Sequence, residues 1–228
     1  MMKRAFAALA VVLVGLVFLH IVGDYAELQA LRPLAHYYVT QVPAQLGAPN
    51  VVTGILISWR GFDTLGEVAV LFMVAASIGL LLQQGDGRET ASPPRRPASE
   101  LVATGAMVLL PLIFTFGAYV IVNGHLSAGG GFQGGAIVAS GVMLMLVANP
   151  AARLNTALLG AVESAAGVLY VCLGVLGLAL AGGFLDPRFL PKGQFGAFIS
   201  AGAIPLISAL LGVKVGAELS VIIDRFRS

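Results

Sequence analysis

Long apolar runs alternate with short polar segments along most of the chain. A helix needs about 20 mostly apolar residues to cross a bilayer. The pattern therefore predicts an all-α integral membrane protein with about six transmembrane helices. Their expected ranges are 5–22, 63–82, 101–122, 130–148, 158–185 and 195–213. The first run also has the length of a signal peptide, but no clear small-residue cleavage site follows it, which favours a retained helix.

Residues 24–50 contain three prolines and read as an exposed connection with a short interfacial helix. Residues 51–82 are nearly apolar, but the polar sequence WRGFDTLGE interrupts them. One straight helix over this stretch would be about 48 Å long, well beyond a bilayer core of about 30 Å. We therefore expect a short interfacial or broken helix near residues 51–60, a break near Gly61, and then a membrane span.

Residues 83–100 form the one polar linker, with three Arg, three Pro and no apolar run. They predict an N-terminal two-helix region over 1–90, a cytoplasmic linker over 91–100 and a four-helix domain over 101–228. With the N-terminus in the cytoplasm, the cytoplasmic segments hold eight Lys and Arg residues and the outer segments three. This bias predicts that both termini are cytoplasmic.

The composition agrees with a membrane protein: 58% of residues are hydrophobic, 11% are charged, and the mean hydropathy is +0.93. A net charge of +2 without a dense basic patch excludes a nucleic-acid binder. The single cysteine, Cys172, excludes a disulfide scaffold. No His, Cys and Asp residues share a metal-ligand spacing, so we expect no metal, no cofactor and no enzymatic activity of the chain on its own.

Charged residues within spans are costly and need a reason. Arg60, Asp63, Thr64 and Glu67 are spaced so that they share one helical face. One interpretation is an interfacial charge cluster at a helix start, which is favoured for Arg60 and Asp63. The other is an ion or proton site. Glu67 lies one turn deeper than Asp63, and both interpretations remain open for it.

Lys214 and Glu218 are four residues apart on the last predicted helix. They form either a pair that reaches the cytoplasmic edge or a buried pair that modulates a proton path. Glu163 is expected to be an interfacial acid in the first turn of its helix. His125 is expected to be a hydrogen-bonded structural residue at an outer helix end rather than a proton relay.

The densest motif is NGHLSAGGGFQGG at residues 123–135. It lacks the Lys-Ser/Thr ending of a phosphate-binding loop and follows no strand, which excludes that function. Glycines four residues apart give small helix faces that allow close packing. Gly130 pairs in this way with Gly134, and Gly131 with Gly135, while Gly129 allows a tight turn.

Two families are recognisable at these motifs. Residues 98–228 resemble the B subunit of Mrp-type multisubunit Na⁺/H⁺ antiporters, and the equivalent hydrogenase subunit, through GAYVIVNGHLSAGGGFQGG at 117–135 and GVKVGAE at 212–218. Family members usually have Pro where this chain has Ala128. Residues 50–85 resemble the C-terminal region of the large Mrp A subunit and the E-type subunit of membrane-bound hydrogenases, through ISWRGFDTLGE at 57–67.

The resemblance implies a small membrane subunit of a complex that exchanges Na⁺ or another monovalent cation for protons. Its partners would be other membrane subunits in the lipid bilayer of the cell membrane. It makes Glu67 the leading ion-path candidate and Lys214 with Glu218 the next. Asp63 is a further candidate, and the weaker candidates are His125, Glu163 and Arg60. The segment 125–135 would be structural. Two alternatives stay open: the same subunit in a redox-driven hydrogenase-type complex, and a purely structural assembly subunit.

Overall fold

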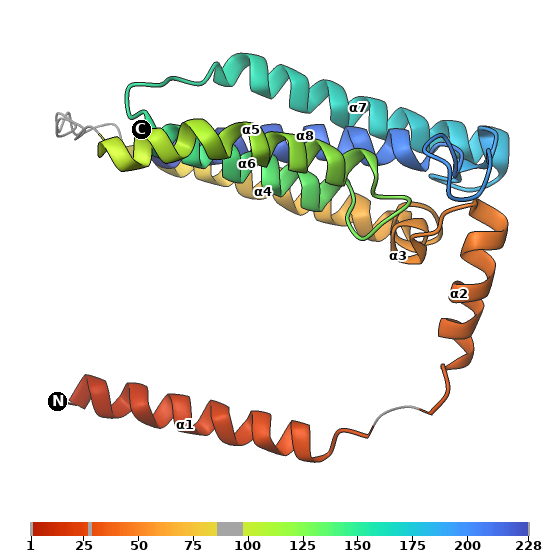
Figure 1. The fold of residues 1–228 in the computed structure, drawn as a ribbon, viewed down its shortest axis with the longest axis horizontal. Helices are drawn as coiled ribbons and strands as arrows, with labels where there is room; N and C mark the ends of the chain where they lie inside the picture. Colours follow the sequence, from red (N-terminus) through yellow and green to blue (C-terminus); the bar gives the residue numbers. More distant parts are fainter. Residues whose placement is uncertain (1, 27–28, 86–97, 228) are drawn as a thin grey trace. The chain divides into compact units, whose positions relative to one another are not determined.

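The computed structural model describes residues 2–26, 29–85 and 98–227, and in these residues no β-strand forms beyond one isolated bridge. Six helices in the described residues are long and apolar enough to cross a membrane, which confirms the predicted all-α class (Figure 1). They are α1 (Met2–Gly23), α4 (Gly61–Gly85), α5 (Glu100–Val122), α6 (Gly131–Ala148), α7 (Thr156–Ala181) and α8 (Ile204–Arg227).

The chain divides into two compact units, one ending at Tyr37 and one starting at Tyr38. The first unit holds α1 and the beginning of α2 (Pro33–Leu46). The apolar core window of α1 has no buried residue. A helix that is apolar all round and unburied is typical of a membrane span, because lipid or other membrane helices cover it.

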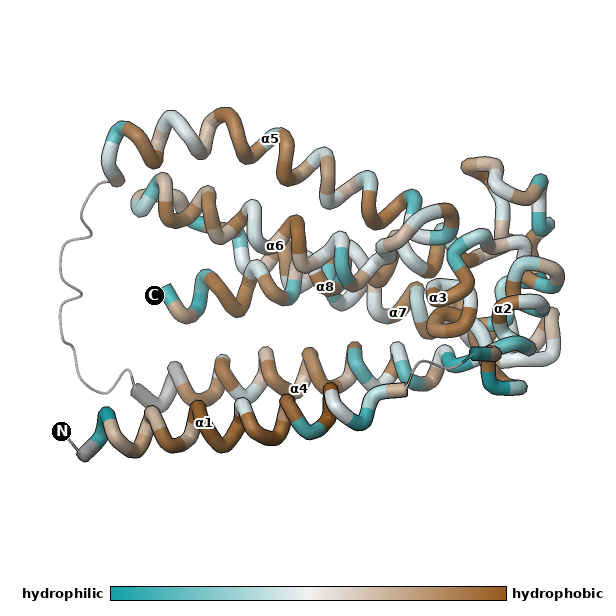
Figure 2. Tube along the Cα trace, turned by 60° about the horizontal axis from the view of Figure 1, so that its bottom comes forward, coloured by the Kyte–Doolittle hydropathy of each residue, from teal (hydrophilic) through white to brown (hydrophobic). Residues whose placement is uncertain are grey.

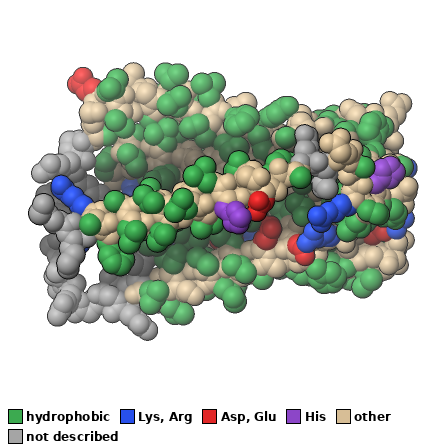
Figure 3. All heavy atoms as spheres, turned by 90° about the horizontal axis from the view of Figure 1, so that it is seen from below, with side chains coloured by type: hydrophobic (Ala, Val, Ile, Leu, Met, Phe, Trp, Pro, Cys, Tyr) green, Lys and Arg blue, Asp and Glu red, His purple; other side chains and the backbone are tan. Residues whose placement is uncertain are grey.

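Helix α8 is the centre of the second unit. It packs against α4, α5, α6 and α7, and 67% of its most apolar window is buried (Figures 1 and 2). The other membrane-spanning helices of this unit bury only 17–33% of theirs. Their outward faces carry large apolar side chains. Figure 3 shows hydrophobic side chains spread over the face of the chain that it draws. The polar positions of this unit therefore matter most where they lie on or against α8.

The predicted broken helix before α4 is confirmed. A short helix α3 (Val51–Gly54) leads into one turn of π-helix η1 (Ile55–Trp59), and the helical path breaks at Arg60, which has φ −119° and ψ 33°. Thr64 bridges the break, because its hydroxyl donates a hydrogen bond of 2.8 Å to the carbonyl of Leu56. Single π-turns inside helices are frequent at functional sites.

The last helix begins at Ile204, so the prediction of a helix from residue 195 was wrong. Residues 195–203 are apolar enough for a span but fold as an irregular segment instead. Ala201 has φ 63°, and its amide donates to the carbonyl of Lys192 at 2.8 Å. An apolar run does not by itself predict a helix. The sequence signal for the start of α8 is Pro205, its second residue, because proline is favoured in the first turn of a helix.

Helix α7 also ends earlier than predicted, at Ala181 rather than residue 185. Gly182 adopts φ 86°, the left-handed conformation that commonly terminates helices. The following loop is closed by Asp186, which accepts hydrogen bonds from the side chain and the amide of Arg188. Burial raises the pKa of Asp186, but these hydrogen bonds and the Arg188 charge outweigh it, so that the pKa is lowered.

Most of the predicted linker, residues 91–97, lies outside the described residues. The predicted domain boundaries and the cytoplasmic location of both termini stay predictions. Alternation of the spans places the 123–130 loop and the 182–203 loop at one end of the second unit, where Figure 1 shows them together.

Candidate functional site

The middle of α8 carries a buried ion pair. Lys214 is the eleventh of 24 residues in α8, so it lies about 15 Å from the start of the helix, near mid-depth. Its Nζ atom lies 3.0 Å from the Glu218 carboxylate, and the two side chains are 8% and 0% exposed. This geometry agrees with the buried-pair interpretation and not with a pair that reaches the membrane edge.

Glu163 completes the cluster from α7. Its Oε1 atom accepts a hydrogen bond from Lys214 Nζ at 3.0 Å, and its side chain is 15% exposed. The expectation of a first-turn interfacial acid was wrong, because Asn155 caps α7 and Glu163 is the eighth residue of the helix. We call Glu163, Lys214 and Glu218 the buried triad.

The buried triad holds two acids and one base. If all three groups are ionised, its net charge is −1. Isolated charges are costly in a low-dielectric interior, and removing one partner of a buried pair leaves the other uncompensated. The Phe72 ring of α4 adds a cation–π contact, with Lys214 Nζ at 5.9 Å from its centroid. Lys214 therefore connects three helices through its single charge.

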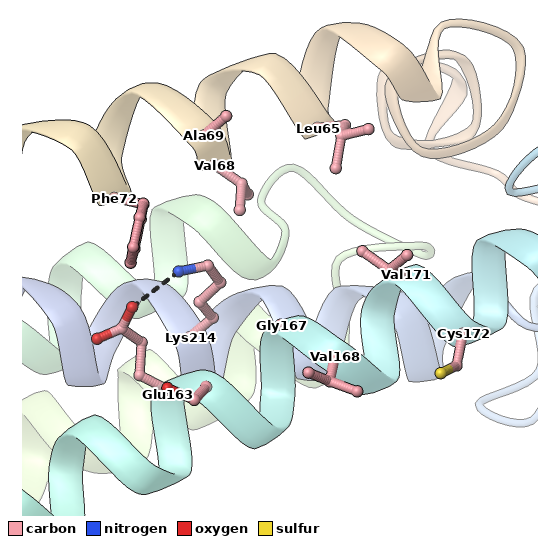
Figure 4. A pocket seen from close by; sticks show the side chains of 11 residues that line it. Leu65, Val68, Ala69, Phe72, Glu163, Gly167, Val168, Val171, Cys172 and Lys214 are labelled. Carbon is pink, nitrogen blue, oxygen red and sulfur yellow. Dashed lines mark hydrogen bonds and ion pairs between the residues drawn. The ribbon is translucent and has the colours of Figure 1, made fainter.

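A groove of about 520 Å³ gives access to the buried triad from the side of the bundle. Figure 4 shows Lys214 and Glu163 between the apolar walls of α4 and α7. Leu65, Val68 and Phe72 line one wall, and Val168, Val171 and Cys172 line the other. Within the chain, Lys214 and Glu163 are thus reachable from the membrane interior, whereas Glu218 is enclosed.

Glu67 lies in a different place from the buried triad. It is exposed on α4 and lines a cavity of about 70 Å³ beside η1. Polar groups of Thr53, Thr64 and Gln133 and the backbone of Gly129–Gly131 share this cavity, which is large enough for about two water molecules. We call it the Glu67 cavity.

The predicted common face of Arg60, Asp63, Thr64 and Glu67 is only partly observed. Thr64 and Glu67 line the Glu67 cavity together. Arg60 lies at the break before α4, and the Asp63 carboxylate is paired with Arg60. Arg60 and Asp63 form an ion pair of 2.6 Å whose side chains are 57% and 45% exposed. An exposed pair of this kind contributes little to stability, which agrees with an interfacial charge cluster at the helix start.

His125 is fully buried in the loop between α5 and α6. Its Nε2 atom lies 3.1 Å from the carbonyl of Phe198, a hydrogen bond across to the 182–203 loop. Burial lowers the pKa of His125, and the Phe198 carbonyl offsets part of this shift. His125 thus joins the two loops, which agrees with the expected hydrogen-bonded structural residue.

Asn50 is a residue that the sequence patterns did not single out. Its side-chain amide donates hydrogen bonds of 2.7 Å to the carbonyls of both Gly124 and Ser127, and its backbone amide donates to the carbonyl of His125 at 3.0 Å. Asn50 also caps α3 by accepting from the amide of Thr53. It therefore joins the segment before α3 to the glycine motif. The one available signal was an Asn before an apolar run, the ordinary mark of a helix cap.

The glycine motif lets α6 approach its two neighbours. A Cβ atom on Gly135 would lie 2.8 Å from the carbonyl oxygen of Gly212 on α8, and one on Gly134 would lie 2.8 Å from that of Gly117 on α5. Gly131 faces Ser208 and Leu211 of α8 in the same way. Gly129 and Gly130 have φ values of 143° and 151°, so they form the turn before α6, and Gly130 does not share the helix contact of Gly134.

Two family models match the chain. A model described as a domain related to the MnhB subunit of the Na⁺/H⁺ antiporter matches residues 101–221. A model described as the E subunit of MBH matches residues 2–98. The two matches meet near the predicted linker. They confirm the resemblance of the two halves to the Mrp B subunit and to the A or E type of subunit.

Among proteins with curated descriptions, an uncharacterized protein of Methanocaldococcus jannaschii is 28% identical over 211 residues, which cover 82% of this chain and 77% of that protein. A probable K⁺/H⁺ antiporter A/B subunit of Rhizobium meliloti is 32% identical over 139 residues. That match covers 50% of this chain and 14% of the longer protein.

Solved structures give fuller coverage. A chain in the structure of the membrane-bound sulfane sulfur reductase, an archaeal respiratory membrane complex, is 35% identical with a TM-score of 0.81. The match covers 99% of this chain and 98% of that chain. A chain of the Mrp complex from Dietzia sp. DQ12-45-1b shares the fold, with 24% identity, a TM-score of 0.75, and coverage of 98% of this chain and 26% of that one. The chain therefore belongs to the family of domains related to the MnhB subunit of Na⁺/H⁺ antiporters, joined to a region of the MBH E-subunit type, and is a multi-pass membrane subunit of the Mrp and MBH kind.

Proposed function

We propose that this chain is a small, non-catalytic subunit of a multisubunit complex in the cell membrane that exchanges a monovalent cation, Na⁺ in the first instance, for protons. The observation that carries the proposal is the buried triad of Glu163, Lys214 and Glu218 at mid-depth of the central helix. Ionisable groups inside a membrane domain are rare and mark ion or proton pathways.

The geometry of the buried triad supports an exchange step. Lys214 Nζ lies 3.0 Å from one oxygen of each acid, so it balances one of the two negative charges. A proton or a small cation that reaches the triad neutralises the second. Glu163 is the acid that borders the groove, while Glu218 is enclosed. Glu163 is therefore the group that receives the incoming ion, and the Lys214–Glu218 pair is the fixed partner.

Glu67 is the second carboxylate that we assign to the ion path. Its cavity offers oxygen atoms from threonine, glutamine and glycine carbonyl groups, the ligand type that hard cations prefer. Because Glu67 is exposed in the isolated chain, its side chain is available to a neighbouring subunit or to water. Asp63 and Arg60 stand near it as the ion pair at the start of α4, and His125 belongs to the loop scaffold.

The test is cation-driven pH change in inverted vesicles that contain the whole complex. Glu163→Gln keeps the size and the hydrogen-bond acceptor and leaves the Lys214–Glu218 pair in place, so the complex should assemble. We expect the rate of Na⁺- or K⁺-driven exchange to fall about tenfold or more, because the acid that takes the ion is gone. Glu67→Gln is expected to lower the rate as well.

Glu100→Gln is the matched control, because Glu100 is an exposed acid in the first turn of α5. Its exchange rate should equal that of the unchanged complex. Wild-type exchange in both Glu163→Gln and Glu67→Gln, with the complex intact, would contradict the proposal. It would leave the chain as a structural assembly subunit.

A redox-driven complex is the alternative that a specific observation favours. The 35% identical chain, which is matched over nearly its full length, belongs to a respiratory membrane complex. In that case the same ion path would be driven by electron transfer in other subunits. Ion uptake that requires an added electron donor, rather than an imposed cation gradient, would identify this second function.

A further inference from the structure

Glu218 has a carboxyl oxygen that the ion path above does not explain. Its side chain is fully buried in α8, and its Oε2 atom accepts a hydrogen bond of 3.0 Å from Lys214 Nζ. Among the described residues, its Oε1 atom has no hydrogen-bond partner. A buried charged group without partners costs more than a neutral one, because the charged form loses more hydration. The surroundings of Oε1 therefore fit a neutral, protonated carboxyl group better than a carboxylate.

Lys214 and Glu163 are the charged groups that face Glu218. Lys214 pairs with Glu218 on α8, and Glu163 approaches the same ammonium group from α7. Helix α6, which packs against α8, carries no charged residue. The remaining charged residues of α4, α5 and α8 in the described part of the chain lie in the Glu67 cavity, in another ion pair or at a helix end: Asp63, Glu67, Glu100, Asp224, Arg225 and Arg227. The charge of Glu218 is therefore set within the buried triad.

One proton on the buried triad removes its net negative charge, and the two acids are not equivalent places for it. A proton on Glu163 would leave Glu218 ionised, with Oε1 unpaired in an enclosed interior. A proton on Glu218 leaves the Lys214–Glu163 ion pair of 3.0 Å, and Glu163 borders the groove, where its other oxygen is accessible. Because a buried charge needs a partner, the second arrangement has the lower free energy when no cation is bound.

We propose that Glu218 is the proton site of the buried triad, and that Lys214 makes a proton on Glu218 and a cation on Glu163 exclude each other. When a monovalent cation reaches Glu163 from the groove, that acid no longer balances Lys214. Glu218 then releases its proton to the solvent and balances Lys214 instead. Lys214 Nζ lies 3.0 Å from an oxygen of each acid, so the exchange of partners requires no helix movement.

The charges balance in both states. Before the exchange the triad holds ionised Glu163, charged Lys214 and neutral Glu218; afterwards it holds a cation on ionised Glu163, charged Lys214 and ionised Glu218. Its net charge is zero each time, so one cation replaces one proton. The Lys214–Glu218 pair described above as the fixed partner is the cation-bound state. The inference rests on the proposed function and adds to it the proton site and the stoichiometry.

Infrared difference spectroscopy of the whole complex, with and without Na⁺ or K⁺, tests the proton site. A protonated carboxyl group has a carbonyl band that a carboxylate lacks, and this band should disappear when the cation is added. Aspartic and glutamic acid absorb at different frequencies, so conservative variants identify the residue that holds the proton. The band should move in Glu218→Asp and stay in place in Glu163→Asp. It should also stay in Glu100→Asp, the control, because Glu100 is exposed in the first turn of α5.

Glu218→Gln provides the second measurement, because glutamine has the shape of the neutral acid but holds no exchangeable acid proton. The Lys214–Glu163 pair remains, so the complex should assemble. We expect one proton fewer to be released per complex when the cation is added, and the rate of cation-driven pH change to fall about tenfold or more.

A carbonyl band that moves in Glu163→Asp instead of Glu218→Asp, or no band that responds to the cation, would overturn the inference. So would unchanged proton release in an assembled Glu218→Gln complex. If Glu163→Gln still reduces exchange in any of these cases, the proposed function stands without the inference. Unchanged exchange in both Glu163→Gln and Glu67→Gln would remove the proposed function itself.

Discussion

At the scale of single residues, the buried triad was only partly predictable. The spacing of Lys214 and Glu218 is visible in the sequence, because side chains four residues apart on a helix meet. The third member, Glu163, is 51 residues away from Lys214. Whether Glu163 meets Lys214 depends on the axial register of α7 against α8, and no pattern in a single sequence determines that register. Asn50 was missed for the same reason, since its hydrogen-bond partners Gly124 and Ser127 are distant in the sequence.

His125 gives a pH prediction at this scale. Burial lowers the pKa of His125 below the ordinary 6.5, so the unfolded chain takes up the proton first as the pH falls. The stability that neutral His125 contributes is present above about pH 6.5 and is lost as the pH falls from there toward the lower folded pKa.

The measurement is the thermal unfolding temperature in detergent between pH 8 and pH 5, for the unchanged chain and for His125→Gln. The unfolding temperature of the unchanged chain should fall more steeply on acidification than that of His125→Gln. His20→Gln is the control, because His20 is exposed on α1. Equal slopes for the unchanged chain and His125→Gln would show that the charge of His125 does not influence folding.

At the scale of elements, hydropathy located the spans but not all their ends. The break before α4 was predictable, because an unbroken helix would be too long for a bilayer. The start of α8 was not, because residues 195–203 are as apolar as a span yet cap the end of the bundle. Ala201 and Ala203 are fully buried there. The large apolar side chains Phe195, Phe198 and Ile199 are exposed, so this apolar segment is neither a helix nor a buried core.

The contact between α6 and α8 gives the prediction for elements. Gly135→Ala places a methyl group within 2.8–3.0 Å of the backbone of Gly212 and Gly216. The two helices must move apart, at a cost of about 1–3 kcal/mol. Gly160→Ala is the control, because nothing in the chain lies within 4 Å of the new methyl group and Ala is the better helix former.

Thermal unfolding in detergent compares the two glycine variants. The unfolding temperature of Gly135→Ala should be several degrees lower than that of the unchanged chain, while that of Gly160→Ala should be equal or higher. Because α8 carries Lys214, loosening this contact should also reduce exchange. A Gly135→Ala chain as stable as the unchanged one would mean that α6 and α8 do not pack as closely as described.

At the scale of the whole molecule, two sequence motifs predicted a part similar to the Mrp B subunit and a part similar to the A or E type of subunit. The two family models confirm both resemblances. The start of α4, which bears RGFDTLGE, and the segment that bears NGHLSAGGGFQGG both line the Glu67 cavity. Asn50, just before α3, is hydrogen-bonded to the same glycine-rich segment. The two motifs are therefore brought together in the second unit, whose central helix is α8. The sequence could indicate each motif separately, but their contact is a property of the fold.

The charge of Lys214 tests the central claim most directly, because it joins α4, α7 and α8 at the buried triad. The measurement is Na⁺- and K⁺-driven pH change in inverted vesicles for the unchanged complex, Lys214→Arg and Lys214→Met, each with its subunit content verified. We predict that Lys214→Met abolishes exchange in an assembled complex, while Lys214→Arg, which keeps the charge, retains part of it. Exchange at the unchanged rate in Lys214→Met would contradict an ion path through the buried triad.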